Sequence, residues 1–338
     1  MTNQEFKLGS KTSGKGFSFL DFISRFREVG IIAFILILVI AVTLREPSFL
    51  DIDNLTDILM NISILIIVAM AQTMVILTKG IDLSVSSIIG LVAMMVGFTL
   101  KANPEFPVIF SVVLGLVLGA ILGSFNGFII TIGNVPPIIA TLGTLSIYRG
   151  LVFFYSQGTW INSYELPHSI KVLSKGKLLG VPNLIVVAIL IAVLTFLFLR
   201  YTRLGRNIYA VGSNPTASEY AGIRPQKIIF IVYVLSGIIS GLAAVLWISR
   251  FESAQTNTAL GFELNTVTAA VIGGVSTSGG VGSIPGVLLG ALLLGVIQNS
   301  LTLIRISPFW QLAAQGLLII VAVVTDKLIS KRIVRTHK

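Results

Sequence analysis

"PVIFSVVLGLVLGAILGSFNGFIIT", residues 107–131, contains no charged side chain and carries glycine at every fourth position from Gly115 through Gly119 and Gly123 to Gly127. A helix that crosses a membrane needs about 20 mostly apolar residues, so this stretch is long enough to cross. Its glycines fall along one face of the predicted helix, where a neighbouring backbone can approach closely. We favour dense packing inside one subunit over a face that slides against another helix.

The rest of the chain shares this composition. Of its 338 residues, 54% are hydrophobic and 11% are charged, whereas soluble domains are about 25% charged. The low charge predicts a polytopic membrane protein. The formal net charge of +10 comes from tails and short loops, which is the cytoplasmic bias of basic residues in membrane proteins and no sign of nucleic-acid binding.

Long apolar runs predict an all-α integral membrane bundle of about nine to ten transmembrane segments. The predicted spans are 29–44, 60–78, 84–100, 107–131, 138–155, 182–199, 228–249, 284–304 and 310–324. A further apolar run, 266–275, is too short to cross at 1.5 Å per residue. It predicts a half-helix or the first part of a broken, re-entrant span.

Basic residues set the predicted orientation. Both tails, 1–28 and 326–338, are rich in Lys and Arg, so both are expected in the cytoplasm, on either side of a membrane domain at 29–325. Six crossings bring the basic segment 200–227 to the same side. Lys171, Lys175 and Lys177 are an exception, because their loop is expected outside. No small-x-small cleavage site follows the first apolar run, so we expect it to remain as a helix.

Two apolar runs are interrupted by Gly and Ser, "LTKGIDLSVSSIIG" at 77–90 and "VIGGVSTSGGVGSIPG" at 271–286. Interrupted helices at matching places in two halves of a chain point to a transport site, and an ordinary tight turn is the alternative. Asp82 is a functional candidate because it lies so close to two spans. It could also pair with Lys79 or cap the next helix beside Ser84, and we favour the capping role.

No catalytic or metal site is predicted. The chain has no Cys, and His168 and His337 are far apart in sequence. "GSKTSGKG" at 9–16 resembles a phosphate-binding loop, but Gly16 stands where Ser or Thr must hold magnesium. The spans also lack the Asp, Glu and His relay of ion-coupled carriers. We therefore expect no cofactor on this chain and an energy source in a partner.

The polar stretch "RLGRNIYAVGSNPTASEYAGIRPQK", residues 203–227, is the most informative loop. Asn214 suits a helix cap and Pro215 a first turn, while Gly222 suits a helix end. Polar turns are expected at 212–215. The loop therefore predicts a short helix with a face of small residues, suited to a groove on a soluble partner.

This loop resembles the coupling loop of permease subunits in bacterial ABC importers of ribose-, galactose-, xylose- and arabinose-type sugars. The matching residues are Gly205, Arg206, Ala210, Gly212, Asn214, Ala217, Gly222 and Ile223. "GIDLSVSS" (80–87, with Ser86 where glycine is usual), "IIATLGTLSIYRG" (138–150), the stretch 271–299 and "SPFWQ" (307–311) are also similar to that family. Within it, residues 136–161 and 305–326 look closest to permeases of autoinducer-2 importers, and are similar to rhamnose and ribose permeases.

The resemblance implies an importer for a sugar or sugar-like solute in the bacterial cell membrane. Its expected partners are an ABC ATPase subunit that uses ATP and magnesium, a second permease subunit, an external solute-binding protein and membrane lipid. Gly205, Arg206, Gly212, Asn214, Ala217 and Gly222 are the expected coupling residues. Candidates for solute contact are Asn61, Gln72, Asn126, Thr141, Thr144 and Asn299, although each could instead hydrogen-bond a neighbouring helix. The alternative function is an ion-coupled secondary carrier.

Overall fold

The computed structural model describes residues 27–307 and residues 310, 313, 316, 317, 320 and 324. Within this part of the chain, eight helices are long and apolar enough to cross a membrane. They are α2 (Arg27–Arg45), α3 (Ile52–Leu77), α4 (Val85–Ala102), α5 (Val108–Thr131), α6 (Pro137–Ser156), α8 (Asn183–Tyr201), α11 (Pro225–Phe251) and α13 (Ile284–Leu303). The predicted all-α membrane bundle is confirmed; the predicted span 310–324 lies mostly outside the described residues, as do the tails with the stretch 9–16.

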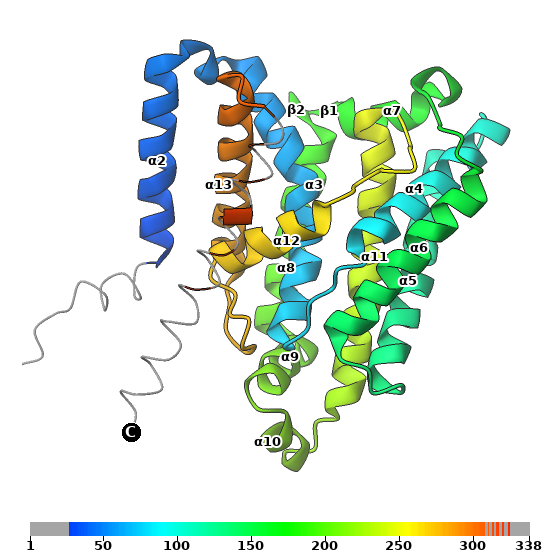
Figure 1. Ribbon diagram of the computed structural model, residues 1–338, viewed down its shortest axis with the longest axis vertical. Coiled ribbons are helices and arrows are strands. Elements are labelled where there is room, and N and C mark those ends of the chain that lie inside the picture. The colour runs from blue at the N-terminus through cyan, green and yellow to red at the C-terminus, as the bar shows by residue number, and fades with distance from the viewer. Residues whose placement is uncertain are drawn as a thin grey trace, which may run out of the picture.

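Shorter elements lie at the two ends of the bundle. They are η1 (Pro47–Leu50), η2 (Ser163–Glu165), α7 (His168–Lys175), the antiparallel strands β1 (Lys177–Leu178) and β2 (Val181–Pro182), α9 (Arg203–Ser213) and α10 (Pro215–Tyr220). Figure 1 shows α7 and the strands at one end and α9 and α10 at the other. We call these the α7 end and the α9 end.

The short apolar run forms α12 (Phe262–Ile272), an 11-residue helix that cannot cross a membrane by itself. It runs across the bundle at mid-height, whereas the spanning helices run along it (Figure 1). The backbone then continues without regular structure to Ser283, the N-cap of α13. The prediction of a half-helix is therefore confirmed.

The predicted glycine stripe packs against a second spanning helix. A Cβ at Gly119 of α5 would lie 2.1 Å from the Gly237 carbonyl oxygen of α11, and one at Gly115 would lie 2.9 Å from the Gly241 carbonyl oxygen. The two backbones therefore touch with no side chain between them. The interpretation as dense packing within one subunit is confirmed.

Charged residues at the α7 end account for two of the three lysines, Lys171 and Lys175 but not Lys177, that the predicted orientation left as an exception. Lys171 and Lys175 of α7 pair with Glu252, which caps the C-terminus of α11. Glu165 pairs with Lys101 at 2.6 Å. Hydrogen bonds from Lys175, then Ser163 and Lys171, lower the pKa of Glu252 to about 2. These lysines serve local ion pairs, so they carry little information on orientation.

Candidate functional site

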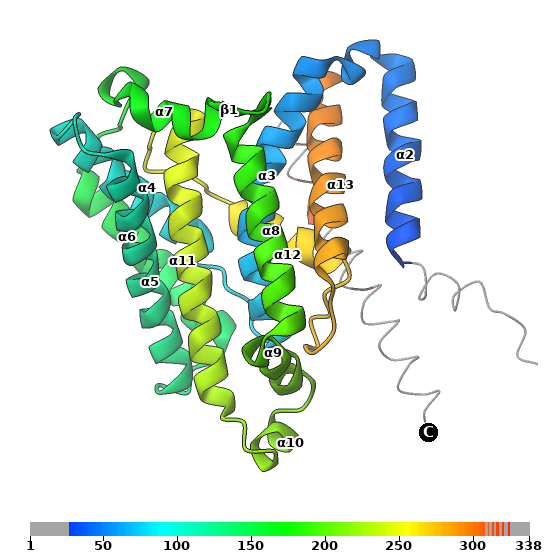
Figure 2. The ribbon, with the colours of Figure 1, turned by 180° about the vertical axis from the view of Figure 1, so that it is seen from behind.

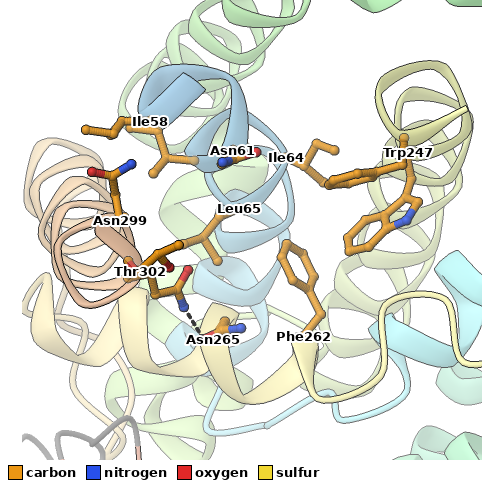
Figure 3. A pocket seen from close by; sticks show the side chains of 13 residues that line it. Ile58, Asn61, Ile64, Leu65, Trp247, Phe262, Asn265, Asn299 and Thr302 are labelled. Carbon is orange, nitrogen blue, oxygen red and sulfur yellow. Dashed lines mark hydrogen bonds between the residues drawn. The ribbon is translucent and has the colours of Figure 1, made fainter. Parts of the chain in front are cut away.

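A cavity of about 610 Å³ opens between four helices. Its residues come from α3, α11, α12 and α13, and they are Ile58, Asn61, Ile62, Ile64, Leu65, Trp247, Phe251, Phe262, Asn265, Gly295, Gln298, Asn299 and Thr302. Figure 3 shows the labelled side chains around one central space, with α12 as its floor. The cavity is concave and lined mostly by apolar and aromatic side chains with a few polar groups, as ligand sites usually are, so it is the candidate site.

The polar part of this wall consists of amides and one hydroxyl. Gln298 donates to the Asn265 side-chain oxygen at 3.2 Å, which joins α13 to α12. Asn299 donates to Asn54 of α3 at 2.9 Å. No residue lining the cavity is ionisable. The wall can therefore hydrogen-bond a neutral polar solute but offers no charge to pair with an ionic one.

Aromatic rings form the opposite part of the wall. Trp247 and Phe262 meet edge to face, with ring centroids 5.2 Å apart and planes at 85°. The Phe251 ring packs against Trp247 in a tilted arrangement, with centroids 4.8 Å apart and planes at 44°. Aromatic pairs in these geometries are stabilising and hold each other in place. The result is a rigid apolar platform that faces the amides.

A buried polar network centred on Asp82 lies apart from the cavity. The Asp82 carboxylate accepts hydrogen bonds from the Ser84 N–H at 3.0 Å, the Ser84 hydroxyl at 2.6 Å and the Ser236 hydroxyl of α11 at 2.9 Å. Asn126 of α5 donates to the Ser84 oxygen at 2.7 Å. Tyr148 of α6 donates to Asn126 at 3.1 Å. The network ties the interrupted segment before α4 to three other helices.

This network corrects two expectations about Asp82. Ser84, and not Asp82, is the N-cap of α4. Lys79 does not pair with Asp82, because its side chain donates to the Ser213 carbonyl oxygen at 3.4 Å. Asp82 is fully buried, so it needs several donors to offset the loss of water. In this structure Asp82 is the centre of a network between helices and not a helix cap.

The polar loop at the α9 end forms two helices. Asn214 caps α10 by accepting from the Ala217 N–H at 3.0 Å, and Pro215 occupies the first turn. Gly222 follows the helix with φ +80°, a conformation that suits glycine. These local predictions are confirmed. The residues before Asn214 form α9 and not the expected turn, because Thr202 caps this amphipathic stretch through the Gly205 N–H.

Gly212 joins α9 to both interrupted segments. A Cβ at Gly212 would lie 1.7 Å from the Leu77 carbonyl oxygen and 2.7 Å from the Gly280 nitrogen. The Gly280 N–H donates to the same Leu77 oxygen at 2.9 Å. Three segments that are distant in sequence therefore meet at one point. We call this meeting of Leu77, Gly212 and Gly280 the glycine junction.

A second bond connects α9 to the loop that leads from α12. The Tyr209 hydroxyl donates to the Gly282 carbonyl oxygen at 2.9 Å. Burial raises the pKa of Tyr209, so this hydroxyl keeps its proton at neutral pH. Beyond the loop, α12 and α13 touch through backbone, since a Cβ at Gly286 would lie 2.0 Å from the Gly273 carbonyl oxygen. These contacts connect α9 to the α12–α13 pair, which supplies about half of the residues that line the cavity.

The sequence of this chain is similar to those of known membrane permeases. Residues 54–323 match the family described as "Branched-chain amino acid transport system / permease component". The chain belongs to this permease family. The ribose import permease protein RbsC of Bacillus subtilis is 38% identical over 86% of this chain and 90% of its own length. RbsC of Escherichia coli K12 is 37% identical, over 86% and 91%. The autoinducer 2 import system permease protein LsrC of Escherichia coli O157:H7 is 35% identical, over 91% and 89%. No solved structure matches.

Two of the six residues predicted to contact solute line the cavity, and the other four do not. Asn61 and Asn299 line the cavity. Among the other four, the Gln72 side chain lies 3.2 Å from the Asp82 backbone, and Asn126 belongs to the Asp82 network. Thr141 donates to the Ile81 carbonyl oxygen at 3.1 Å, and Thr144 is buried within α6. Gln72, Asn126 and Thr141 bond the interrupted segment at 81–84, whereas Thr144 donates to Thr141 within α6.

Several residues of the permease cavity were not predicted from sequence. Gln298 and Thr302 lie on the same face of α13, and Asn265 follows Phe262 by three residues on α12. A helical spacing of three or four could have revealed both pairs. Trp247 and Phe251 share that spacing on α11. Such pairs occur throughout apolar helices, so the spacing does not say which of them face a cavity.

The predicted coupling residues differ in exposure: some are exposed to solvent and others are buried. Asn214, Ala217 and Gly222 lie on the exposed α10 or just beside it. Gly205 and Gly212 are buried inside the bundle. Arg206 is exposed, but it lines a second cavity between α8, α9 and α13. The predicted set therefore spans an outer contact surface and the glycine junction behind it.

Proposed function

We propose that this chain is the permease subunit of an ATP-driven importer and forms the pathway for a neutral sugar or sugar-like solute. The observation that carries the proposal is the cavity of amides and aromatic rings, whose α12–α13 wall is connected to α9 and α10. A wall that moves with an exposed helix can be driven from outside the membrane. The relatives named above are import permeases, which favours this function over an ion-coupled carrier.

The chemistry of the cavity supports a sugar-like solute. Amide groups both donate and accept hydrogen bonds, which matches hydroxyl groups. The Trp247 and Phe262 rings offer an apolar surface to the C–H face of a sugar ring. A branched-chain amino acid, which the family description mentions, carries an ammonium and a carboxylate that would need charged partners. The residues lining the cavity offer none.

The surface of α10 supports an ATPase partner. Tyr220 is 90% exposed at the tip of this helix, and Ala217 is also exposed. In this proposal the ATPase subunit binds ATP and magnesium, and the permease itself catalyses no reaction and binds no nucleotide. Differential contact of the ATPase with α10 in its two states would shift the pathway between conformations. The α9 end and both tails then face the cytoplasm of a bacterial cell.

Two further partners complete the proposed importer. A second permease subunit, identical or homologous, would form the pathway together with this chain. An external solute-binding protein would deliver the solute at the α7 end. Ribose, rhamnose and autoinducer-2 are the proposed solutes, because they belong to the class that the cavity chemistry favours.

Uptake measurements test this function. Cells with and without the gene would be given radiolabelled ribose, rhamnose, autoinducer-2 and leucine. We expect one of the first three to lose import on deletion. Loss of leucine uptake alone would contradict the proposed solute class, and uptake that persists without the ATPase but stops on collapse of the ion gradient would contradict the importer.

Ala217→Glu tests the role of α10. The substituted carboxylate on the exposed helix should disturb the ATPase contact and abolish uptake while the protein stays in the membrane. The control is Ala217→Ser, which keeps a small uncharged side chain at the same exposed position and should transport normally. Normal uptake by Ala217→Glu would remove α10 from the mechanism.

A further inference from the structure

A second cavity of about 360 Å³ lies at the α9 end, between α8, α9 and the start of α13. Two arginines, Arg200 of α8 and Arg206 of α9, line it together with Tyr209 and Ser283. It is separate from the proposed solute cavity, which has no ionisable lining. Its charge calls for a different ligand.

Neither arginine forms an ion pair within the described part of the chain. The Arg200 guanidinium lies over the Phe196 and Tyr201 rings, 5.8 Å from each centroid. Arg206 donates through Nη1 to the Tyr201 carbonyl oxygen at 3.3 Å. Most guanidinium N–H groups of both residues therefore remain available to an anion.

One carboxylate lies near the far rim of this cavity. Glu28 of α2 accepts a hydrogen bond from the Ser283 hydroxyl at 3.0 Å, so Ser283 is occupied by that contact and by the Gly286 N–H. The two arginines carry two positive charges and Glu28 carries one negative charge, so the net charge around the cavity is +1. A phosphodiester group, with one negative charge, balances that charge.

An apolar groove of about 250 Å³ continues from this cavity along the bundle. The two spaces share Phe196, Ile284 and Pro285, and every residue lining the groove is apolar. Figure 2 shows α8 beside α13, with α9 below α8. From Ala188 to Phe196 the groove follows nine residues of α8, about 12 Å at 1.5 Å for each of the eight steps between them. Val193 is 47% exposed on its rim, so the groove is open at its side.

We infer that the cavity and groove together bind one anionic phospholipid, with its phosphate between Arg200 and Arg206 and an acyl chain in the groove. A soluble phosphate compound would use only the arginines and leave the groove empty. A neutral hydrocarbon would use only the groove. A lipid of the leaflet at the α9 end satisfies both parts at once, and paired arginines are the common donors to phosphate. It would also bridge α8 and α9 to α13 beside the Tyr209–Gly282 bond.

The headgroup half of the proposal is tested with full-length protein purified in detergent and freed of lipid. Thermal unfolding midpoints and native mass spectra would be recorded with phosphatidylglycerol and with phosphatidylcholine of the same acyl chains. We expect retention of phosphatidylglycerol and a raised midpoint, with affinity at least tenfold lower in Arg200→Gln/Arg206→Gln. The matched control, Arg203→Gln/Arg224→Gln, removes two exposed arginines from the same end outside the cavity and should bind as wild type.

The acyl half is tested with Val193→Trp, which covers the groove from its exposed rim without entering the core. Leu190→Trp is the control, because Leu190 is 53% exposed on α8 and does not line the groove. We expect Val193→Trp alone to lose phosphatidylglycerol. Inorganic phosphate that stabilises as well as the lipid, or lipid binding unchanged by both Val193→Trp and the double arginine variant, would overturn the proposal.

Discussion

The two sides of α11 show two ways in which this permease uses a helix surface. Along part of its length α11 meets α5 through Gly237 and Gly241, so closely that no side chain separates the backbones. Nearer the α7 end, Trp247 and Phe251 of the same helix face the cavity. We call the first surface sealed, because it is packed directly against another backbone, and the second open, because it faces a cavity.

A second sealed contact lies across the cavity. There α12 and α13 touch at Gly273 and Gly286, as closely as α5 and α11 do. The cavity therefore lies between α11, which is held tightly to α5, and the α12–α13 pair, and α3 forms the rest of its wall. Small residues permit such contacts in membranes, where packing rather than hydrophobicity drives helix association. We infer that change in the cavity comes from movement between the pairs and not within them.

Gly119→Leu should break the sealed surface, and it has the largest expected effect. The added side chain would collide with the Gly237 backbone, and such overpacking should lower the free energy of unfolding by about 3 kcal/mol or more. The yield of monodisperse protein in detergent and its unfolding midpoint measure the loss. Gly143→Leu on α6, where a Cβ would meet nothing within 4 Å, is the control. Equal behaviour of the two variants would show that the α5–α11 contact is not tight.

Asp82→Ala tests a third contact of α11, through Ser236. Removing the carboxylate leaves three donors without an acceptor in the interior, which should cost about 2–3 kcal/mol. Thermal unfolding in detergent checks this value. Ser236→Ala removes one donor and should cost less than half as much. A smaller effect for Asp82→Ala than for Ser236→Ala would contradict its place at the centre of the network.

Asn265→Leu tests the open surface, where activity and not stability should change. One lost hydrogen bond to solute corresponds to about tenfold slower uptake at low solute concentration. Asn257→Leu is the control, since Asn257 is exposed near α12 and does not line the cavity. An unfolding midpoint that falls while uptake per folded molecule stays normal would assign Asn265 to packing.

Tyr209→Phe tests the hydrogen bond between α9 and the loop before α13, through which we expect movement of α9 to reach the α12–α13 pair. The change removes only the bond to Gly282, and a loss of about 1 kcal/mol predicts uptake lower by roughly fivefold. Tyr201→Phe, at a residue 64% exposed at the end of α8, should transport normally. Uptake would be measured per permease molecule by immunodetection. Unchanged uptake in Tyr209→Phe would contradict transmission through this bond.

Glu252 gives the smallest expected effect, at the α7 end of α11. Because its pKa is lowered to about 2 in the folded protein, its stabilising contribution is present at neutral pH and is lost as pH falls from about 4.5 towards 2. Glu252→Gln should therefore lie below wild type in unfolding midpoint at pH 7, and the gap should close in acid. Glu105→Gln, exposed at the same end, should follow the wild-type profile. A gap that widens in acid would contradict the lysine contacts.

Length and apolarity predicted the spanning helices well, because the membrane thickness fixes both. The exception is α3, expected from residue 60 but starting at Ile52. Its first turns carry Asp53 and Asp57, which the apolar criterion excluded. Acidic residues are favourable at a helix N-terminus, and Asp57 also pairs with Arg250 at 3.0 Å. That partner is distant in sequence, so local composition could not reveal it.

The site was less predictable than the fold. A glycine stripe gives the face of a helix but not the neighbour that meets it. Likewise, Asn126 and Asn299 both bond another segment, and the sequence does not show that only Asn299 also lines the cavity. The glycine junction could not be predicted from the sequence either. Leu77, Gly212 and Gly280 are far apart along the chain and come into contact only in the folded protein. Gly212 itself was predicted, from family resemblance and not from geometry.

The Asp82–Ser236 bond has a consequence for biogenesis. It joins residues 154 positions apart, so the carboxylate emerges from the ribosome long before its partner on α11. Lipid cannot satisfy the non-helical backbone around Asp82 in the meantime. Until α11 is delivered, Ser84 is the only one of the donors to the Asp82 carboxylate that the nascent chain can offer, so we expect chains truncated before Ser236 to be less stable in the membrane than the full chain.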